Sequence, residues 1–208
     1  MCIRDRSNAI LKIHKFEEGE IYFNGLDISK IQGKELLAFR KNIQIVFQDP
    51  YASLNPLHNI YQIISEPLIF HKICGKEDLY EECKKLINDV GLSEKYLNSY
   101  PHELSGGQRQ RVCIARAISV KPQVLICDES VSALDVSIQA TVLNLLNQLK
   151  QKYSFTYIFI SHDLSVVRHM SDKILVLHNG KIVEYNDADL LFKKPKDSYT
   201  KKLINASL

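Results

Sequence analysis

The stretch "QVLICDES", residues 123–130, is a continuous apolar run that ends in two adjacent acids. A run of this kind is typical of a buried parallel strand with functional groups at its carboxyl end. A second apolar run, "TYIFISHD" at 156–163, also ends in polar residues. Strands that alternate with helices indicate a mostly parallel α/β sheet, and ligands bind such sheets beyond the carboxyl ends of the strands. The polar clusters at 128–130 and 161–163 are therefore the first candidate site.

The rest of the chain predicts hairpins and helices around these two runs. Asn24-Gly25 is flanked by alternating apolar residues and predicts a β-hairpin, and a second Asn-Gly pair follows at 179–180. Between Leu57 and about Val120 apolar residues recur at helical spacing, so we expect a mostly helical insert there. The other expected elements are a strand at 42–50 that stops at Pro50, and helices at about 137–152 and 164–170.

The bulk composition excludes several classes of protein. A net charge of +3 on 208 residues is too mild to argue for nucleic acid as a partner. The five cysteines include no C-x-x-C pair, which argues against a zinc site or a disulfide framework and favours a reducing compartment. No apolar run approaches the roughly 20 residues that span a bilayer, and "MCIRDRS" at the start lacks the apolar stretch of a signal peptide. We therefore expect a chain that is neither exported nor embedded in a membrane.

The segment "HELSGGQRQR", residues 102–111, places Ser105 and two glycines directly before a predicted helix. The free N–H groups and the positive end of the helix dipole at such a place suit an anion, and glycine lets a phosphate approach the backbone closely. For these three residues taken alone, an ordinary N-cap with Ser105 as the capping residue is the favoured explanation.

Asp128 and Glu129 close the apolar run at 123–130, where adjacent carboxylates are costly unless they meet a cation or a water to activate. An aspartate there suits Mg²⁺, and a neighbouring glutamate suits orienting or deprotonating a water. Each candidate has an ordinary structural explanation when it is taken alone. These are solvent-exposed strand-end acids at 128–129, a structural His162, a surface Gln48 and a helix cap at Asp135.

The order of the motifs resembles one family. Q-D-P, L-S-G-G-Q, an apolar strand ending in D-E, S-A-L-D and S-H-D follow one another as in the ATP-hydrolysing subunit of an ABC transporter, from about Ala9 to the end of the chain. The matched motifs are the Q-loop at Gln48, the signature at Leu104–Gln108, the Walker B strand at Val124–Asp128, the catalytic glutamate at Glu129, the D-loop at Ser132–Asp135 and the switch histidine at His162.

This resemblance implies an α/β fold, with a P-loop NTPase-like, mostly parallel sheet, an α-helical subdomain insert and β-hairpins. Residues 8–208 would form a partial ABC ATPase domain. Its expected parts are a helical subdomain at about 52–120, a core from Walker B to the switch histidine at about 121–192, and a tail at about 193–208.

The resemblance also implies a role for each site residue, because in this family two subunits face each other head to tail and enclose two ATP molecules. Catalysis would fall to Glu129, His162 and Gln48, while Asp128 and Gln48 would hold Mg²⁺. The expected nucleotide-contacting residues are Ser105, Gly106, Gly107, Gln108 and Asp135, the last of which would couple the two sites.

Longer matches narrow the resemblance to the oligopeptide/dipeptide importer branch. They include "VFQDPYASLNP", "SALDVSIQATVLNLL" and the tail "KKPKDSYTKKLI", although Asp197-Ser198 replace His-Pro in the tail and Ser130 stands where proline is usual. The implied partners are permease subunits, met by the helical insert, a second ATPase subunit for which analogy favours a paralogue, and indirectly an extracytoplasmic solute-binding protein, but no nucleic acid. The implied location is peripheral, on the cytoplasmic face of the membrane.

The largest departure from the family lies at the front of the chain. The phosphate-cradling P-loop, G-x-x-G-x-G-K-[ST], is absent, and its Lys and Ser should fall where Ile3 and Arg4 stand. We interpret residues 1–7 as a foreign end, and we expect this chain alone to bind ATP poorly and to hydrolyse it negligibly. We also expect the strand at 124–128 to be left with an exposed apolar edge, because the P-loop strand should pair there.

Two alternatives stay open at this point. One is a soluble ABC ATPase that acts on DNA or ribosomes, for which long coiled-coil, zinc-finger or linker insertions are expected and none is visible. The other is a non-catalytic regulatory module of the same fold, against which Glu129 and His162 are retained. Peptides are the favoured cargo, and only the resemblance supports this choice. Nickel and other small solutes are cargoes in the same branch of the family.

Overall fold

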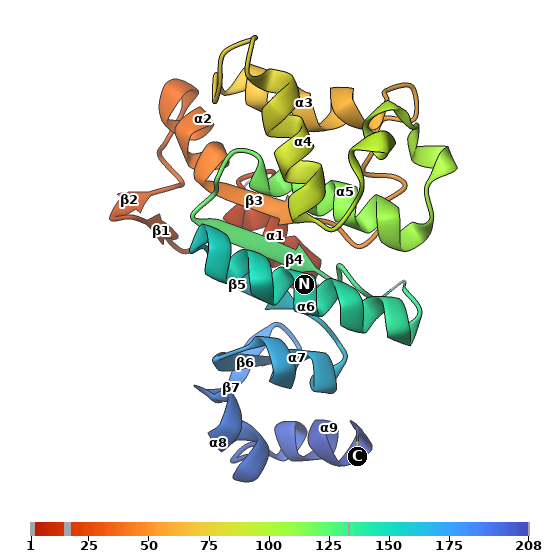
Figure 1. Cartoon of the computed structure of the whole chain (residues 1–208). Coiled ribbons are helices and arrows are strands. Elements are labelled where there is room, and N and C mark those ends of the chain that lie inside the picture. The colour runs from red at the N-terminus through yellow and green to blue at the C-terminus, as the bar shows by residue number, and fades with distance from the viewer. Residues whose placement is uncertain (1–2, 15–17, 133, 208) are drawn as a thin grey trace. The chain divides into compact units, whose positions relative to one another are not determined.

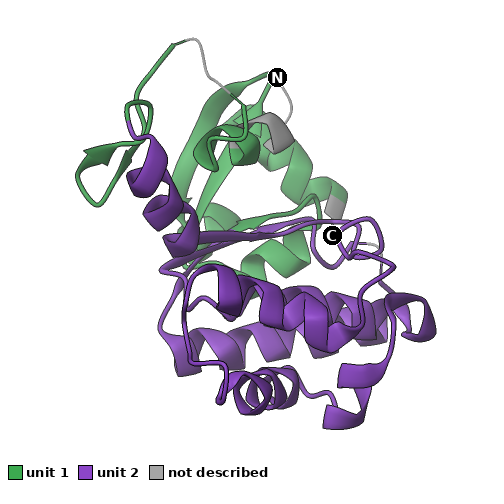
Figure 2. Cartoon of the chain, turned by 90° about the horizontal axis from the view of Figure 1, so that it is seen from above, with its two compact units in different colours: residues 1–30, 159–208 green, residues 31–158 purple. Residues whose placement is uncertain are grey.

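The computed structural model describes residues 3–14, 18–132 and 134–207. The chain divides into two compact units, one of residues 31–158 and one of residues 1–30 with 159–208, which Figure 2 shows in different colours. The signature segment and the acids of 123–130 fall in the first unit, and the polar cluster at 161–163 falls in the second.

A three-stranded sheet has the strand order β3 (Ile43–Val46), β4 (Val124–Asp128), β5 (Thr156–Ile160), and all of it except the last two residues of β5 falls in the unit of residues 31–158. Strands β3 and β4 run parallel, with Ile43 opposite Val124 and Val46 opposite Cys127. Burial is complete along the middle of β4, which is why its sequence reads as an unbroken apolar run. The predicted parallel α/β sheet is confirmed.

The predicted exposed edge at 124–128 is wrong. Strand β4 is hydrogen-bonded to β3 on one side and to β5 on the other, so it lies in the middle of the sheet that the structure describes. The outer strands of this sheet are β3 and β5, and the last four residues of β5 are only half-buried. The apolar run at 123–130 indicates a buried strand but does not reveal which strands pair with it, because a buried strand is apolar whatever its neighbours are.

Strand β3 is shorter than the predicted strand at 42–50. It ends at Val46, and the chain turns directly after Gln48, where the Asp49 side chain accepts hydrogen bonds from the backbone N–H groups of Tyr51, at 2.8 Å, and Ala52, at 3.2 Å. A short acidic side chain that binds the backbone two residues ahead forms such a turn. Gln48 therefore lies just beyond the carboxyl end of β3, outside the sheet.

The predicted helical insert is confirmed, and its helices gather in the upper part of Figure 1. Helix α3 begins with a capping box between Asn59 and Gln62, and the whole region packs on fully buried aliphatic side chains such as Ile64 and Leu86. The elements are α3 (Ile60–Phe70), α4 (Leu79–Asp89), the 3-10 helices η1 (Glu94–Asn98) and η2 (Pro101–Glu103), and α5 (Gly106–Ile118).

Helix α6 (Val136–Tyr153) follows β4 and confirms the predicted helix at about 137–152. Its last turn is tied to the end of α4, because Asp89 bonds Lys152 Nζ at 2.5 Å and also accepts a short hydrogen bond from the Tyr153 hydroxyl. Helix α2 (Gly33–Asn42) has no counterpart among the expected elements. The sequence signal for the start of α2 is weak, because the N-cap residue is Gln32 and its side chain makes no capping hydrogen bond.

The other unit contains both predicted hairpins, which are confirmed. In each, the Asn-Gly pair has positive φ at both residues, as a two-residue hairpin turn requires: 48° and 79° at Asn24-Gly25, and 47° and 77° at Asn179-Gly180. The elements are α1 (Ile3–Ile10), β1 (Tyr22–Phe23), β2 (Leu26–Asp27), α7 (Leu164–Met170), β6 (Lys173–His178), β7 (Lys181–Asp187), α8 (Ala188–Lys193) and α9 (Ser198–Ser207).

Helix α1 runs continuously from Ile3 to Ile10, so the predicted boundary after residue 7 coincides with no break in the helix. The end of this unit is held by a buried carboxylate: Glu184 of β7 accepts backbone N–H bonds from Lys196 and Asp197, each at 3.0 Å. Across the described residues, no helix combines the length and the apolar character needed to cross a bilayer.

Candidate functional site

The two acids predicted at the end of the central strand lie in different surroundings. Asp128 is the last residue of β4 and is 5% exposed. Glu129 follows it with a φ of +46°, in the left-handed region that few residues other than glycine adopt. Such conformations cost about 1–3 kcal/mol and concentrate at functional sites. A turn holds this geometry, because Ser132 donates to the Glu129 carbonyl from both its backbone N–H, at 3.1 Å, and its hydroxyl, at 2.9 Å.

Gln48 lies beside this turn. Its side-chain Nε2 is 3.5 Å from the Ser132 hydroxyl oxygen, although 84 residues separate the two in the sequence. The structure thus brings Gln48, Asp128 and Glu129 together at the carboxyl ends of neighbouring parallel strands. This is the edge at which the sequence predicts the site.

The donors at this edge fit a magnesium ion. Mg²⁺ prefers oxygen ligands and is usually held by one or two carboxylates together with water and substrate phosphates. Asp128 supplies a buried carboxylate, and the Gln48 amide presents its nitrogen rather than its oxygen to Ser132. Among the residues described, no three His, Cys, Asp or Glu side chains cluster as a complete protein cage would require. The donor set therefore suits a site that a phosphate group completes.

The segment predicted to contact the nucleotide begins α5. Ser105 is its N-cap, and Ser105 and Gln108 form a capping box: the Ser105 hydroxyl accepts from Gln108 N at 3.3 Å, and Gln108 Oε1 accepts from Ser105 N at 2.9 Å. The N-cap explanation is thus correct for Ser105. It does not exclude an anion site, because the first turn of a helix has further N–H groups with no acceptor inside the helix.

The two glycines of this turn differ. Gly106 is partly exposed, and a Cβ built on it would meet only Leu134, at an ordinary 3.8 Å. Gly107 is buried and faces Ile138 of α6. A side chain would therefore have room at Gly106 but not at Gly107.

Helix α5 also holds the chain that follows Gln48. Arg116 donates to the carbonyl of Ser53 at 2.6 Å, and the guanidinium of Arg109 lies over the ring of Tyr51 at 5.5 Å. These contacts join two motifs that are about 60 residues apart in the sequence. A displacement of the turn after Gln48 would therefore also move α5, the helix whose N-cap is Ser105.

For Asp135 and His162, the structure gives the position in the fold but does not test the predicted role. Asp135 occupies the N-cap position of α6, but its exposed side chain makes no capping hydrogen bond, so the helix-cap explanation does not account for its carboxylate. His162 is exposed and lies in the other unit, where its neighbour Asp163 caps α7. The role of His162 beside Glu129 stays a prediction.

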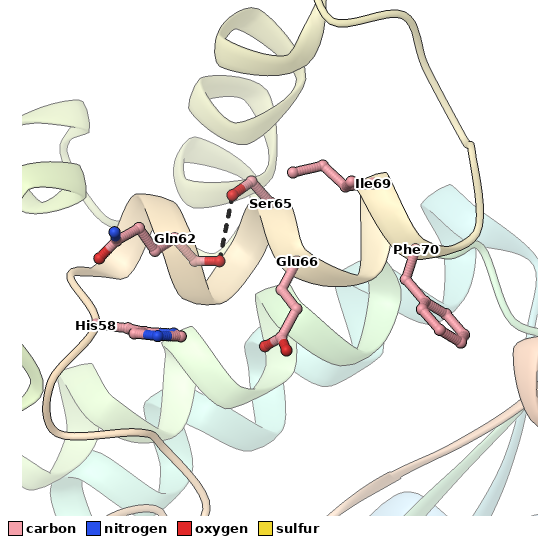
Figure 3. Close-up of a pocket in the computed structure, with 6 residues that line it drawn as sticks. All are labelled: His58, Gln62, Ser65, Glu66, Ile69 and Phe70. Atoms are coloured by element: carbon pink, nitrogen blue, oxygen red, sulfur yellow. Dashed lines mark hydrogen bonds between the residues drawn. The ribbon is translucent and has the colours of Figure 1, made fainter.

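A hollow of about 390 Å³ lies along α3, apart from these residues (Figure 3). Ile69 and Phe70, at one end of it, are among the more exposed large apolar side chains of the chain. The lining residues are His58, Gln62, Ser65, Glu66, Ile69 and Phe70.

Two residues of the site are missing from the sequence-based assignment. Ser132 lies within the predicted D-loop, but only the fold reveals that it bridges Gln48 and Glu129. Tyr96 receives a hydrogen bond from Gln108 Nε2 at 3.0 Å, and it belongs to no motif. The S-A-L-D pattern could have identified Ser132, whereas no sequence signal identifies Tyr96.

The chain has well-characterised relatives. The family model described as ABC transporter matches residues 7–132. The oligopeptide transport ATP-binding protein OppF of Streptococcus mutans is 49% identical over 199 residues, which cover 95% of this chain and 65% of that protein. The dipeptide transport ATP-binding protein DppF of Escherichia coli is 45% identical over 189 residues, covering 91% of this chain and 57% of that protein.

Solved structures agree with this similarity. The protein cbiO1 from Clostridium perfringens, described as part of the ABC transporter complex cbiONQ, superposes with a TM-score of 0.82 at 26% identity, over 92% of this chain and 74% of that one. The ATP-binding cassette MJ0796, in a dimeric post-hydrolysis state bound to ADP and Pi, superposes with a TM-score of 0.78 at 29% identity, over 89% of this chain and 80% of that one.

Proposed function

This chain belongs to the ABC transporter family, and on that premise we propose that it is the ATP-hydrolysing subunit of an importer for oligopeptides or dipeptides. The observation that carries the proposal is the meeting of Gln48 with the turn that follows Asp128 and Glu129. The peptide cargo rests on the names of the relatives, since it is a separate part of a transporter that selects the solute.

The residues at the strand ends divide the chemistry between them. Glu129 orients the attacking water and accepts its proton, and the turn made by Ser132 fixes the backbone from which that carboxylate projects. Asp128 and Gln48 would be the residues of this chain that hold Mg²⁺. When bound, Mg²⁺ offsets the negative charge on the phosphoryl oxygens. His162 contacts the terminal phosphate.

The start of α5 serves a nucleotide held by the second ATPase subunit, a paralogue by analogy. Its partly exposed Gly106 lets a phosphate approach the first helical N–H groups, and the helix dipole favours the negative charge. The MJ0796 structure, which superposes on this chain, is dimeric with ADP and Pi bound. Asp135, whose side chain makes no capping bond, lies near the start of α6 and couples the two sites.

The permease docks on the helical insert, at the hollow along α3. Exposed Ile69 and Phe70 offer it an apolar surface, and a cytoplasmic segment of the permease is the occupant. Arg116 and Arg109 connect the chain after Gln48 to α5, and α5 packs against α3, so closure on ATP reaches the region of this hollow through packed contacts. The subunit works in this way at the cytoplasmic face of the membrane, attached to its permease.

The experiment replaces one carboxylate in the assembled transporter. Glu129→Gln keeps the shape of the side chain and removes the base, so steady-state ATP hydrolysis should fall by roughly 10²-fold or more, while ATP stays bound. The matched control is Glu77→Gln, at an exposed position outside the site, which should leave turnover unchanged. Turnover near the wild-type value in Glu129→Gln would refute the assignment of this residue.

A further inference from the structure

We propose that Tyr96 is a positioning residue for ATP binding, which acts through Gln108 to fix the turn that begins α5. The inference rests on the proposed function, because it concerns the same nucleotide-contacting turn. It adds a residue that lies outside every motif of the chain, on the 3-10 helix η1, where the relation to residues 105–108 exists only in the fold.

Gln108 is held at both ends of its side-chain amide. Its Oε1 accepts from Ser105 N at 2.9 Å, and its Nε2 donates to the Tyr96 hydroxyl at 3.0 Å. Its backbone N–H donates to the Ser105 hydroxyl at 3.3 Å. The Ser105 N–H can only donate, so it fixes which end of the amide faces the turn, whereas the Tyr96 hydroxyl can pair with either end. The Tyr96 hydroxyl therefore holds the far end of the side chain in the rotamer in which Gln108 accepts from Ser105.

Tyr96 is well placed to act as this anchor. Its backbone N–H donates to Ser93 O and its carbonyl accepts from Ser99 N, at 3.0 and 3.1 Å, and the next side chain, Leu97, is fully buried. The ammonium of Lys95 lies 5.3 Å from the centre of the Tyr96 ring. These contacts hold the backbone from which the Tyr96 side chain reaches Gln108.

The side chain of Gln108 has room to leave this position. A hollow of about 290 Å³ lies beside the start of α5, lined by Tyr96, Ser105, Gly107 and Gln108 together with Gly91, Leu92, Ser93, Arg111 and Ile138. Packing alone therefore does not hold the amide. Without the Tyr96 hydroxyl, Gln108 gains rotamers in which Ser105 N loses its acceptor, and the turn must be ordered again when a nucleotide binds.

This places the effect on ATP affinity rather than on the chemical step. Asp128 ends β4, and Glu129 lies in the turn that follows it. The side-chain amide of Gln108 bonds Ser105 and Tyr96 instead of either acid. Once ATP has ordered the turn, hydrolysis proceeds as in the wild type. A residue that only stabilised the fold would instead lower the melting temperature and leave KM for ATP unchanged.

The test is Tyr96→Phe, which removes one oxygen, measured in the assembled transporter. We expect KM for ATP to rise roughly two- to tenfold, as loss of one neutral hydrogen bond implies, with kcat and the melting temperature retained. The matched control is Tyr80→Phe on α4, outside the site. In a Gln108→Leu background the same Tyr96→Phe change should have no further effect, because both variants remove one interaction.

An unchanged KM in Tyr96→Phe, or additive effects of the two variants, would overturn the inference. A fall in melting temperature without a change in KM would also overturn it. Glu129→Gln separates these failures from a failure of the proposed function. If Glu129→Gln stops hydrolysis while Tyr96→Phe has no effect on KM, then only the role of Tyr96 is wrong.

Discussion

Gly107 of α5 lies so close to Ile138 of α6 that a Cβ built on the glycine would stand 2.6 Å from Ile138 Cγ2. No ordinary side chain fits at that distance. The second glycine of the signature segment is therefore required by the packing of two helices within this subunit. At Gly106, by contrast, a Cβ would meet only Leu134, at an ordinary 3.8 Å.

The contact predicts that Gly107→Ala destabilises the protein. Overpacking of this kind costs about 1–3 kcal/mol, because Ile138 or the backbone must move. The free energy of unfolding, measured in urea, gives the loss directly. Ile138→Ala removes the opposing Cγ2 and should restore part of it in the double variant, so additive losses would show that the contact is not the cause.

Gly106→Ala should behave in the opposite way. The new methyl group meets only Leu134, at 3.8 Å, so the free energy of unfolding should stay within about 0.5 kcal/mol of the wild type. The methyl group would, however, stand where the proposed phosphate approaches, and ATP hydrolysis by the transporter should fall at least tenfold. Wild-type hydrolysis in Gly106→Ala would contradict the proposed trans contact.

Ser132→Ala removes the hydroxyl that donates to the Glu129 carbonyl at 2.9 Å and lies 3.5 Å from Gln48 Nε2. We expect kcat to fall roughly three- to tenfold, because the turn that holds Glu129 in its left-handed conformation loosens. Ser132→Thr keeps the hydroxyl and serves as the control. Steady-state hydrolysis at saturating ATP measures the effect, and equal rates in both variants would rule it out.

Phe70→Asp tests the hollow along α3. Phe70 is 64% exposed, so the change should leave the fold and ATP binding intact. Association with the permease and transport should both be lost, because a carboxylate replaces the apolar surface. Leu190→Asp on α8, at a residue that is 49% exposed, is the control and should still assemble. Co-purification of subunits provides the measurement, and full assembly of Phe70→Asp would place the permease elsewhere.

Glu184 predicts a pH-dependent anchor for the end of the chain. Burial by itself would raise the pKa of its carboxyl, but the backbone N–H bonds from Lys196 and Asp197, together with the Thr200 hydroxyl and the charge of Lys196, outweigh burial and lower the pKa. A lowered folded-state pKa means that the anchor stabilises the fold above the unfolded-state pKa of about 4.3 and is lost as pH falls through the folded value.

The Lys196 and Asp197 amides report this anchor directly. At pH 7 they should exchange hydrogen more slowly in the wild type than in Glu184→Gln, and the difference should shrink at acidic pH once Glu184 is protonated. Glu77→Gln, at an exposed position, should match the wild type throughout. A difference between wild type and Glu184→Gln that does not depend on pH would show that the charge of Glu184 is not what anchors the segment.

The sequence by itself determined most of the strands and helices and the order of the motifs, although helix α2 has no counterpart among the predicted elements. Apolar runs such as 123–130, helical spacing in the insert and the Asn-Gly pairs encode local structure, because burial and backbone conformation act on neighbouring residues. The motif order identified the family through Gln48, Glu129 and His162. These signals come either from residues that are neighbours in the sequence or from the order of the motifs along the chain.

The tertiary structure alone decided the relations between those segments. It placed β4 between β3 and β5 instead of at an edge, set Ile138 against Gly107, and brought Tyr96 to Gln108 and Ser132 to Gln48. Such contacts depend on how helices and strands pack, and packing joins residues whose separation along the chain carries no pattern. The same physical reason explains why the sequence did not reveal the packing of Gly107 against Ile138.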